Sequence, residues 1–265
     1  MKDAKGLIIV TDLDGTLLDG DGKVPERNLR GIDRFKAAGG RFTIASGRYG
    51  NSVGRLFPGF REYVNAPTVF SNGAVLFDEK KGEPISEITC KAAVMRRRME
   101  DIQKALPEME IFPIVMRDGA LKRQWWSEVD DGEDVYKVLF SGKTELLERA
   151  RTFVDGRFPG VWAMSFSCPT LLELVLPEAT KGKALGRMRD WFAAQGETVR
   201  IVAVGDYEND LDMLLSADIA ACPDNAIPAI KEASEIRLCD HNDGCIGDLV
   251  ERILDNDFQL TERSR

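Results

Sequence analysis

The chain has 265 residues, of which 43% are hydrophobic and 30% are charged, and these fractions are ordinary for a soluble enzyme. Its length suffices for one large domain or for two smaller domains with well-buried cores. The formal net charge of −8 at pH 7 argues against non-specific binding to nucleic acid or to a membrane surface, because the chain has no basic excess to collect phosphate groups.

The cysteines and the amino terminus indicate a cytoplasmic location. The five cysteines are odd in number, are scattered along the chain, and lack the spacing of a zinc site, so we expect reduced thiols. The first apolar run has only four residues before Thr11, which is too short for a signal peptide or a membrane span. We therefore expect a cytoplasmic protein without a membrane partner.

This apolar run, residues 7 to 10, predicts a strand that is buried on both faces of a parallel sheet. Asp12 and Asp14 follow it, and the two-residue period of an extended chain places both carboxylates on the same side. The carboxyl end of such a strand is where open α/β sheets bind ligands. Gly15 then allows the backbone to turn.

Two carboxylates this close raise each other's pKa unless a cation lies between them. Mg²⁺ suits carboxylate and backbone carbonyl oxygens, and it retains waters that a phosphate group can replace. The pair therefore predicts a Mg²⁺ site and a phosphorylated substrate. The alternative is a local role, since Asp and Gly are common in turns for reasons of backbone geometry.

A second strand ends in a similar way. A turn-rich loop at residues 19 to 22 precedes a helix at residues 25 to 38, and a buried strand follows at residues 42 to 45. Directly after it come residues 46 to 48, Ser-Gly-Arg, where the hydroxyl of Ser46 and the neighbouring amides suit a phosphoryl oxygen at the start of the next helix. An ordinary helix N-cap is the alternative for this serine.

The middle of the chain has a different pattern. A strand at residues 68 to 71 and a turn at Asn72-Gly73 lead into a hairpin strand at residues 75 to 77, and the polar stretch at residues 80 to 84 predicts a domain boundary. Residues 83 to 178 then repeat a helix with paired strands, which predicts a compact α/β insert with a mostly antiparallel sheet. We expect helices at 91 to 105 and 144 to 154, and strands at 110 to 116, 120 to 127, 135 to 140, 161 to 167 and 171 to 176.

The parallel pattern resumes after the insert. A helix begins at Lys181-Gly182-Lys183, and a lysine there is electrostatically unfavourable, which points to a functional role for Lys181 or for its rival Lys183. The strand at residues 199 to 204 ends in a second acidic group, in which Asp206 can reach the metal of the neighbouring strand. Helix capping is the alternative for Asp206.

The remaining segments alternate short strands and helices. Strands are expected at residues 219 to 222 and 236 to 238, and helices from about residue 227 and at residues 245 to 254. The only histidine, His241, lies in a polar loop and is interpreted as structural or exposed. We expect the tail from Phe258 to be frayed.

Several of these segments resemble one family. Residues 12 to 19, DLDGTLLD, resemble the first motif of the haloacid dehalogenase-like phosphatase superfamily, and residues 205 to 214, GDYENDLDML, closely resemble the fourth motif of its Cof-like sugar-phosphatase branch. The second and third motifs correspond to Ser46-Gly47-Arg48 and Lys181. The resemblance covers nearly the whole chain. It implies a Rossmann-like parallel-sheet core, residues 1–82 plus 179–265, and an inserted α/β cap for substrate specificity, residues 83–178.

The resemblance also implies roles for individual residues. Asp12 is expected to be the nucleophile and Asp14 the general acid and base. The expected phosphate-binding residues are Ser46, Gly47, Lys181 and Asn209. The expected Mg²⁺ ligands are the Asp12 carboxylate, the Asp14 backbone carbonyl and Asp206. Five further positions are candidates for the site: Thr16, Arg48, Asn72, Asp210 and Asn225.

The leading hypothesis is a Mg²⁺-dependent phosphatase that hydrolyses small phosphomonoesters through an aspartyl-phosphate. Sugar phosphates are the expectation from the family, with nucleotide, pyridoxal and flavin phosphates behind them. A phosphomutase of sugar phosphates is the main alternative, and a non-catalytic phosphate-sensing protein is a third. The expected partner is a small phosphorylated metabolite, and the expected state is a monomer or a small homo-oligomer.

Overall fold

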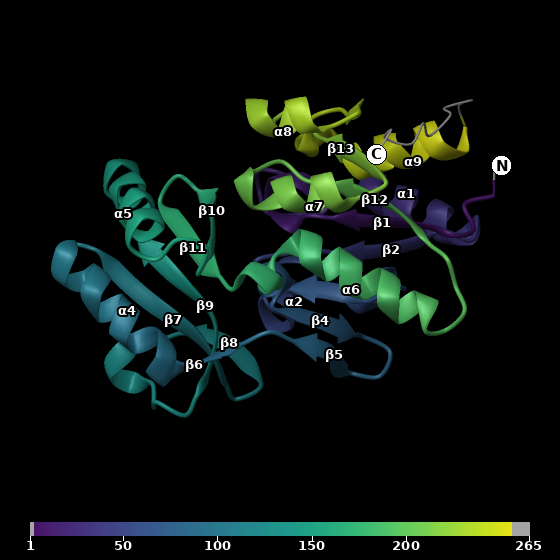
Figure 1. Cartoon of the computed structure of the whole chain (residues 1–265). Coiled ribbons are helices and arrows are strands. Elements are labelled where there is room, and N and C mark those ends of the chain that lie inside the picture. The colour runs from purple at the N-terminus through teal and green to yellow at the C-terminus, as the bar shows by residue number, and fades with distance from the viewer. Residues whose placement is uncertain (1–2, 256–265) are drawn as a thin grey trace.

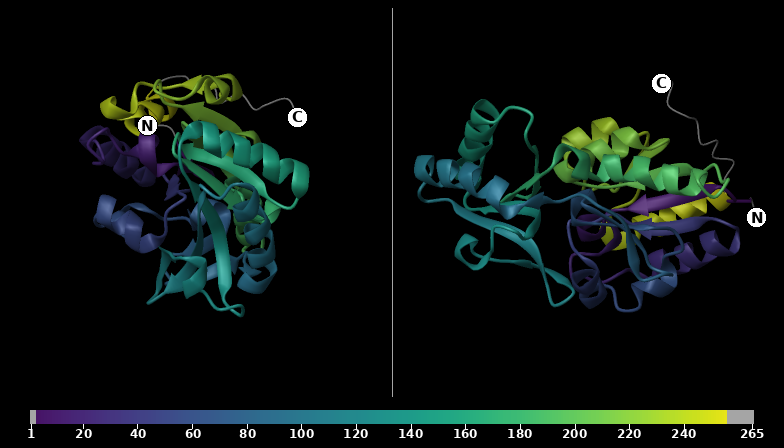
Figure 2. Two further views of the ribbon diagram at one scale, coloured as in Figure 1. Left: turned by 90° about the vertical axis from the view of Figure 1, so that its left-hand side faces the viewer. Right: turned by 60° about the horizontal axis from the view of Figure 1, so that its bottom comes forward.

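The computed structural model describes residues 3 to 255, and the tail from Phe258 lies outside the described residues. The chain forms two lobes (Figure 1). One lobe, here called the core, contains both ends of the described chain, and the other, here called the cap, is formed by the middle of the chain (Figure 2). Within the described part, no helix combines the length and the apolar character needed to cross a bilayer.

The core is built on a parallel sheet of five strands in the order β14-β13-β12-β1-β2. The strand β1 lies between β12 and β2, and its apolar residues are buried on both faces, as the sequence predicts. Because all five strands run in one direction, their carboxyl ends meet at one edge. The strands are β1 (Leu7–Thr11), β2 (Arg41–Ile44), β12 (Arg200–Val204), β13 (Ile219–Cys222) and β14 (Ile236–Arg237).

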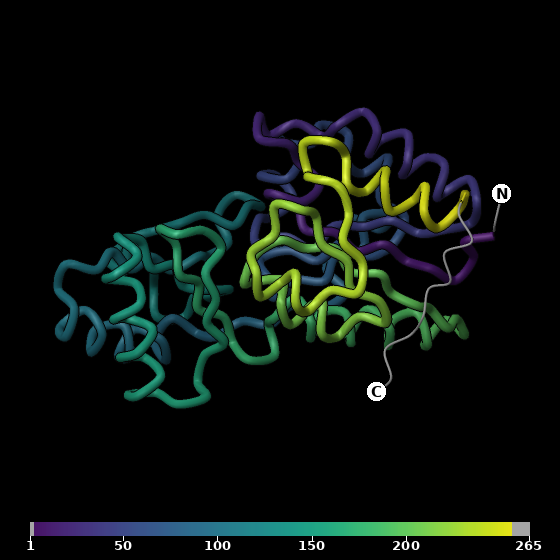
Figure 3. The backbone as a smooth tube through the Cα atoms, turned by 90° about the horizontal axis from the view of Figure 1, so that it is seen from above, coloured from purple at the N-terminus to yellow at the C-terminus, as the bar shows by residue number. Residues whose placement is uncertain are grey.

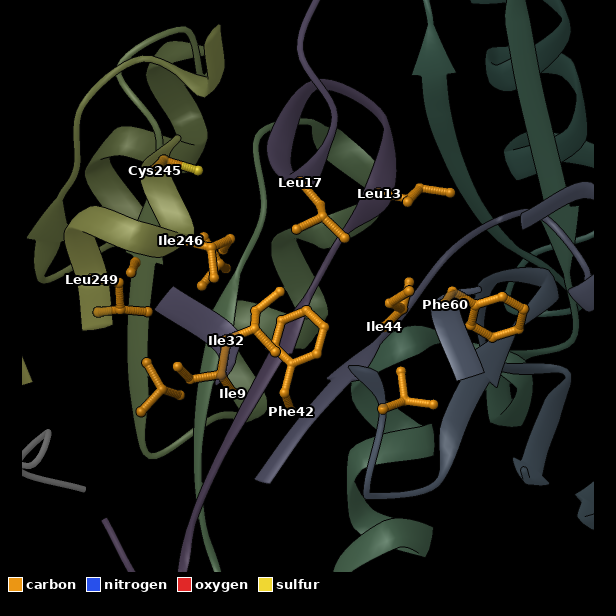
Figure 4. Close-up of a cluster of buried hydrophobic side chains, with 14 of the residues drawn as sticks. Ile9, Leu13, Leu17, Ile32, Phe42, Ile44, Phe60, Cys245, Ile246 and Leu249 are labelled. Atoms are coloured by element: carbon orange, nitrogen blue, oxygen red, sulfur yellow. The ribbon is translucent and has the colours of Figure 1, made fainter. Parts of the chain in front are cut away.

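Helices cover both faces of this sheet. On one face α1 (Glu26–Ala37) and α9 (Cys245–Leu254) pack on Ile9 and Phe42 (Figure 4). On the other face, which carries Ile8 and Val10, lie three helices (Figure 3). These are α6 (Lys181–Ala193), α7 (Leu211–Ser216) and α8 (Pro228–Ala233), while the short helices α2 (Gly50–Leu56) and α3 (Phe60–Tyr63) follow β2.

A small antiparallel sheet extends the core, in the order β3 (Thr68–Phe70), β4 (Val75–Asp78), β5 (Glu83–Glu87). The sequence predicts that the insert begins at residue 83, whereas β5 pairs with β4. The polar stretch at residues 80 to 84 forms part of the hairpin turn and the first residues of β5, and the Gly82 N–H donates to the Asp78 carbonyl at 2.8 Å across this turn. We propose that the cap begins after this strand.

The cap is an antiparallel sheet with two helices on one face, α4 (Ala92–Ala105) and α5 (Thr144–Arg157). Its helix-free face is turned toward the core (Figure 1). The strand order is β10-β11-β9-β7-β8, and β6 pairs with β9. The strands are β6 (Cys90–Lys91), β7 (Glu110–Arg117), β8 (Ala120–Arg123), β9 (Asp134–Ser141), β10 (Ala163–Cys168) and β11 (Leu171–Val175).

The predicted α/β class is confirmed, and most strands and helices lie within a few residues of their expected positions. One expected strand is too long: β8 ends at Arg123, and the residues from Trp126 to Glu128 form a short helical turn, η3. The reason is the Glu128 carboxylate, which accepts a hydrogen bond from the Trp125 N–H at 3.0 Å and so closes a turn.

Close packing of α1 on α9 yields a stability prediction. A Cβ added at Gly31 in α1 would lie 2.8 Å from the Cα of Gly247 in α9, whereas a Cβ at Gly186 in α6 meets no atom within 4 Å. We expect Gly31→Ala to lower the free energy of unfolding by about 1–3 kcal/mol through overpacking. The matched variant Gly186→Ala should raise it by about 0.5–1 kcal/mol. Denaturant titration checks both, and equal effects of the two variants would contradict the packing argument.

Candidate active site

The predicted site residues meet at the carboxyl edge of the parallel sheet. Asp12 follows β1, Ser46 follows β2 and Asp206 follows β12, so the three positions are neighbours because their strands are neighbours. The Asp12 N–H donates to the Val204 carbonyl at 2.8 Å, which continues the pairing of β1 with β12 to the start of the site.

Lys181 is at the centre of this edge. Its side chain is fully buried, and Nζ lies 2.5 Å from Asp12 Oδ1 and 2.6 Å from Asp210 Oδ1. Burial lowers the pKa of the lysine, but the two carboxylates outweigh it, so the pKa is raised and the ammonium stays charged. Lys183 is more than half exposed and lies 3.6 Å from Glu178. Of the two candidate lysines, only Lys181 is therefore in contact with the acidic residues at the edge of the sheet, Asp12 and Asp210.

Three buried carboxylates surround this ammonium: those of Asp12, Asp206 and Asp210 each offer an oxygen within 4.8 Å of the others. Burial is the largest cause that raises the pKa of Asp12, and the charges of Asp210 and Asp206 add to it. The pKa of Asp206 is raised to about 7, first by burial and then by Asp210. When all are ionised, three carboxylates and one ammonium leave a net charge of −2 in this cluster, which a divalent cation would neutralise.

Asp206 is held in place by the segment after β1. Thr16 Oγ1 donates to Asp206 Oδ1 at 2.8 Å, and a Cβ on Gly15, whose φ is +76°, would lie 2.5 Å from Asp206 Oδ2. The capping alternative for Asp206 is wrong. It is the Asp210 carboxylate that accepts the N–H groups of Asp206 and Tyr207, at 3.0 and 3.2 Å.

The donor set of this cluster fits a hard divalent cation. Asp210 already accepts from Lys181 and from two backbone amides, whereas Asp12 and Asp206 lie close together with pKa values raised first by burial and then by neighbouring carboxylates. Oxygen ligands alone favour Mg²⁺ over softer metals. The carboxylates of Asp12 and Asp206 are therefore the groups in the cluster best able to bind the cation.

Asp14 lies apart from the buried cluster and pairs with Arg48. The guanidinium donates twice, from Nε to Asp14 Oδ2 at 2.7 Å and from Nη2 to Oδ1 at 2.9 Å, and both side chains are about half exposed. Ser46 is buried beneath them, and its hydroxyl accepts a hydrogen bond from the Arg48 N–H at 3.1 Å. The capping alternative for Ser46 is wrong, since α2 begins only at Gly50 and Tyr49 precedes it.

The three predicted asparagines have different positions. Asn209 Nδ2 donates to Asn72 Oδ1 at 3.4 Å, so these two form a long contact at the rim of the cluster. Asn225 Nδ2 donates to the Gly15 carbonyl at 2.8 Å, and this hydrogen bond stabilises the turn that follows Asp14. His241 has the structural role expected, because its Nδ1 is 2.7 Å from the Leu18 carbonyl.

A cavity of about 440 Å³ opens onto these residues between core and cap. The core contributes Asp12, Asp14, Gly47, Arg48, Asp206, Tyr207 and Asn209, and the cap contributes Lys137, Ser167, Cys168, Pro169, Leu171 and Glu173. Sequence reasoning missed Lys137 and Glu173. The signal was a charged residue in the interior of each of two mostly apolar strands, which is unusual for strands of a buried sheet.

Comparison with known proteins agrees with the motifs. The family model of the haloacid dehalogenase-like hydrolases matches residues 9–121 and 116–249. The chain is 25% identical over 281 residues to the 5-amino-6-(5-phospho-D-ribitylamino)uracil phosphatase YitU of Bacillus subtilis, covering 97% of this chain and 100% of that protein.

Solved structures share the fold over nearly the whole chain. TM0651 from Thermotoga maritima is 27% identical with a TM-score of 0.70, covering 95% of this chain and 97% of that chain. The sugar phosphatase BT4131 of subclass IIB has a TM-score of 0.75 at 16% identity, and the match covers 93% of this chain and 98% of that chain. The chain therefore belongs to the haloacid dehalogenase-like hydrolase family, in its Cof-like branch, and its enzyme class is that of the phosphoric monoester hydrolases.

Proposed function

We propose that this enzyme hydrolyses small phosphomonoesters in a Mg²⁺-dependent reaction through an aspartyl-phosphate on Asp12. The observation that carries the proposal is the position of the Asp12 carboxylate. It lies at the floor of the cavity, with one oxygen on the buried ammonium of Lys181 and with Asp206 beside it. A carboxylate fixed in this way is a competent nucleophile toward phosphorus.

In the first step an Asp12 oxygen bonds to phosphorus, and the bond from phosphorus to the leaving oxygen breaks. Because Lys181 holds Oδ1 of Asp12, Oδ2 is the oxygen best placed to attack. Asp14 leaves the Arg48 guanidinium to act as the acid: in its protonated form it gives its proton to the leaving oxygen, and it then takes a proton from the water that cleaves the aspartyl-phosphate. Lys181 and the Ser46 hydroxyl stabilise the charge on the equatorial oxygens.

Arg48 has two contacts that matter for these steps. Its guanidinium holds Asp14 at the cavity mouth, and its N–H donates to the Ser46 hydroxyl oxygen, which leaves the hydroxyl proton for a phosphoryl oxygen. Mg²⁺, held by the carboxylates of Asp12 and Asp206 and by the Asp14 carbonyl, would supply the positive charge that the cluster lacks. Asp210 orients Lys181 and the amides before α7.

The proposed substrates are phosphorylated metabolites with a hydroxyl-rich leaving group, sugar phosphates first. The cavity supports this class, since Ser167 of the cap places a hydroxyl opposite the aspartates. A similar protein, YitU, is named for a phosphorylated ribityl compound. A cytoplasmic location fits the scattered free cysteines.

Asp12→Asn tests the nucleophile. We expect phosphate release from a panel of phosphorylated metabolites to require Mg²⁺ and to fall at least about a thousandfold in this variant, because the amide is not a nucleophile. Asp118→Asn, on the cap surface, is the matched control and should keep the parental rate. Full activity of Asp12→Asn, or conversion of a sugar phosphate to an isomer without release of phosphate, would contradict the phosphatase proposal.

Lys181→Met and Lys183→Met separate the two lysines. Removing the buried ammonium leaves Asp12 and Asp210 without a counter-charge, so we expect a loss of about 3–5 kcal/mol in the free energy of unfolding together with loss of phosphate release. Removing the exposed lysine should change stability by less than about 1 kcal/mol. Denaturant titration and a phosphate assay on both variants check this, and equal behaviour of the two would refute the assignment.

The raised pKa of Asp206 predicts how Mg²⁺ and pH act together. The folded value is about 7 against an ordinary 3.8, so between these values the folded protein retains a proton that the unfolded chain releases. This group's contribution to stability is therefore complete below about pH 4 and is lost as the pH rises to about 7. Because Mg²⁺ replaces the proton, MgCl2 should raise Tm more at about pH 8 than at about pH 5. Scanning calorimetry checks this, and Asp206→Asn should abolish most of the difference.

A further inference from the structure

Two charged side chains on the helix-free face of the cap sheet are buried against the core. Lys137 in β9 and Glu173 in β11 are each 5% exposed, and Lys137 Nζ lies 2.5 Å from Glu173 Oε2. Leu139 is the register partner of Glu173, so Lys137, two residues away, is a diagonal neighbour on the same face. Burying both charges is costly unless each has further partners.

Those partners belong to the core. Lys137 Nζ donates to the Gly47 carbonyl at 2.8 Å, and Glu173 Oε2 accepts a hydrogen bond from Asn72 Nδ2. The packing is tight: a Cβ added at Gly47 would lie 2.9 Å from Asn72 Oδ1 and 3.5 Å from Glu173 Oε1. The ion pair of the cap therefore rests directly on the backbone that follows Ser46.

The turn that carries Asn72 is strained. Ser71 has φ +52° and Asn72 has φ +58°, a region that non-glycine residues occupy mainly where their surroundings impose it. Two hydrogen bonds within the core help to hold this backbone conformation. The Ser71 N–H donates to the Arg48 carbonyl at 2.9 Å, and the Asn72 N–H donates to the Ser46 carbonyl at 3.0 Å. Residues 46–48 and 71–72, here called the paired loops, thus form one hydrogen-bonded unit.

We propose that Lys137 and Glu173 are positioning residues for phosphoryl transfer. With the cap on the core, their ion pair fixes the Gly47 carbonyl and the Asn72 amide, and it thereby holds the paired loops in the shape that receives the phosphoryl group. This inference rests on the proposed phosphatase function and adds the cap residues on which the reaction depends. Since both side chains are occupied by core partners, their effect is the same for every leaving group.

The test measures kcat and KM for Mg²⁺-dependent phosphate release from two substrates, p-nitrophenyl phosphate and the much smaller acetyl phosphate. Lys137→Met/Glu173→Met removes both charges at similar volume, so its Tm is expected to stay near that of the parent. We expect its kcat to fall about tenfold on both substrates, with KM changed less than about threefold. Glu173→Gln keeps the shape of the side chain and should lower kcat about threefold.

Lys122→Met is the matched control, because it removes an exposed ion pair of the cap, with Asp118, and should leave both constants at the parental values. Parental kcat in the double variant, or in a folded Glu173→Gln variant, would overturn the inference. A loss confined to one substrate would also overturn it, since the pair would then act on the leaving group.

The proposed function and this inference can fail separately. If the parent protein releases no phosphate from any substrate, the proposed phosphatase function is refuted. The positioning role of Lys137 and Glu173 is then tested by calorimetric titration of the parent and the double variant with inorganic phosphate and MgCl2. Binding about tenfold weaker in the double variant supports the positioning role. Affinity equal to that of the parent contradicts it.

Discussion

The buried ammonium of Lys181 is the interaction on which the site depends. It is the first residue of α6, where the helix dipole disfavours a cation, and it is completely removed from water. Only the carboxylates of Asp12 and Asp210 make this position favourable. In turn, these carboxylates can be ionised side by side only because the ammonium is there. The ammonium therefore stabilises the charged form of the carboxylates, and they stabilise the charged ammonium, whereas the carboxylates disfavour ionisation of one another and the cluster as a whole still lacks positive charge.

The sheet topology brings these charges together from distant parts of the chain. The strand β1 lies inside the sheet and pairs with β12 on one side and β2 on the other, so residues after three strands converge without long loops. Hydrogen bonds across the sheet edge then set the details, such as Thr16 to Asp206 and Asn225 to the Gly15 carbonyl. A rigid sheet edge suits an enzyme that must keep a nucleophile in line with a phosphorus atom.

The sequence predicts the fold well because the core strands are mostly apolar, and small or acidic residues follow three of them, β1, β2 and β12. Asp12 and Asp206 could be placed for the same reason. The residue pattern alone could not distinguish Lys181 from Lys183, because the two share one helix start, and only the resemblance to the third motif favoured Lys181. The strand β5 was missed because residues 80 to 84, which contain a glycine and a proline, have the composition of a linker.

The contacts of the cap residues Lys137 and Glu173 could not be predicted from the sequence, for a different reason. A lone charge within an apolar strand indicates that something unusual is buried, but it does not name the partner. For Lys137 and Glu173 the partners are each other, a backbone carbonyl and an amide side chain of the core. Such contacts depend on how two lobes meet, and no local pattern encodes that arrangement.

The strand order has a consequence for how the protein is made. The strand β1 is synthesised before the cap, whereas its partner β12 follows only after the entire cap. The cap is continuous in sequence and has its own apolar cluster, so it can form while the core is still incomplete. Until β12 arrives, one side of an apolar strand has no pairing partner, and this edge is open to other chains. Synthesis of this enzyme therefore includes an interval in which the edge of β1 that later pairs with β12 is unpaired.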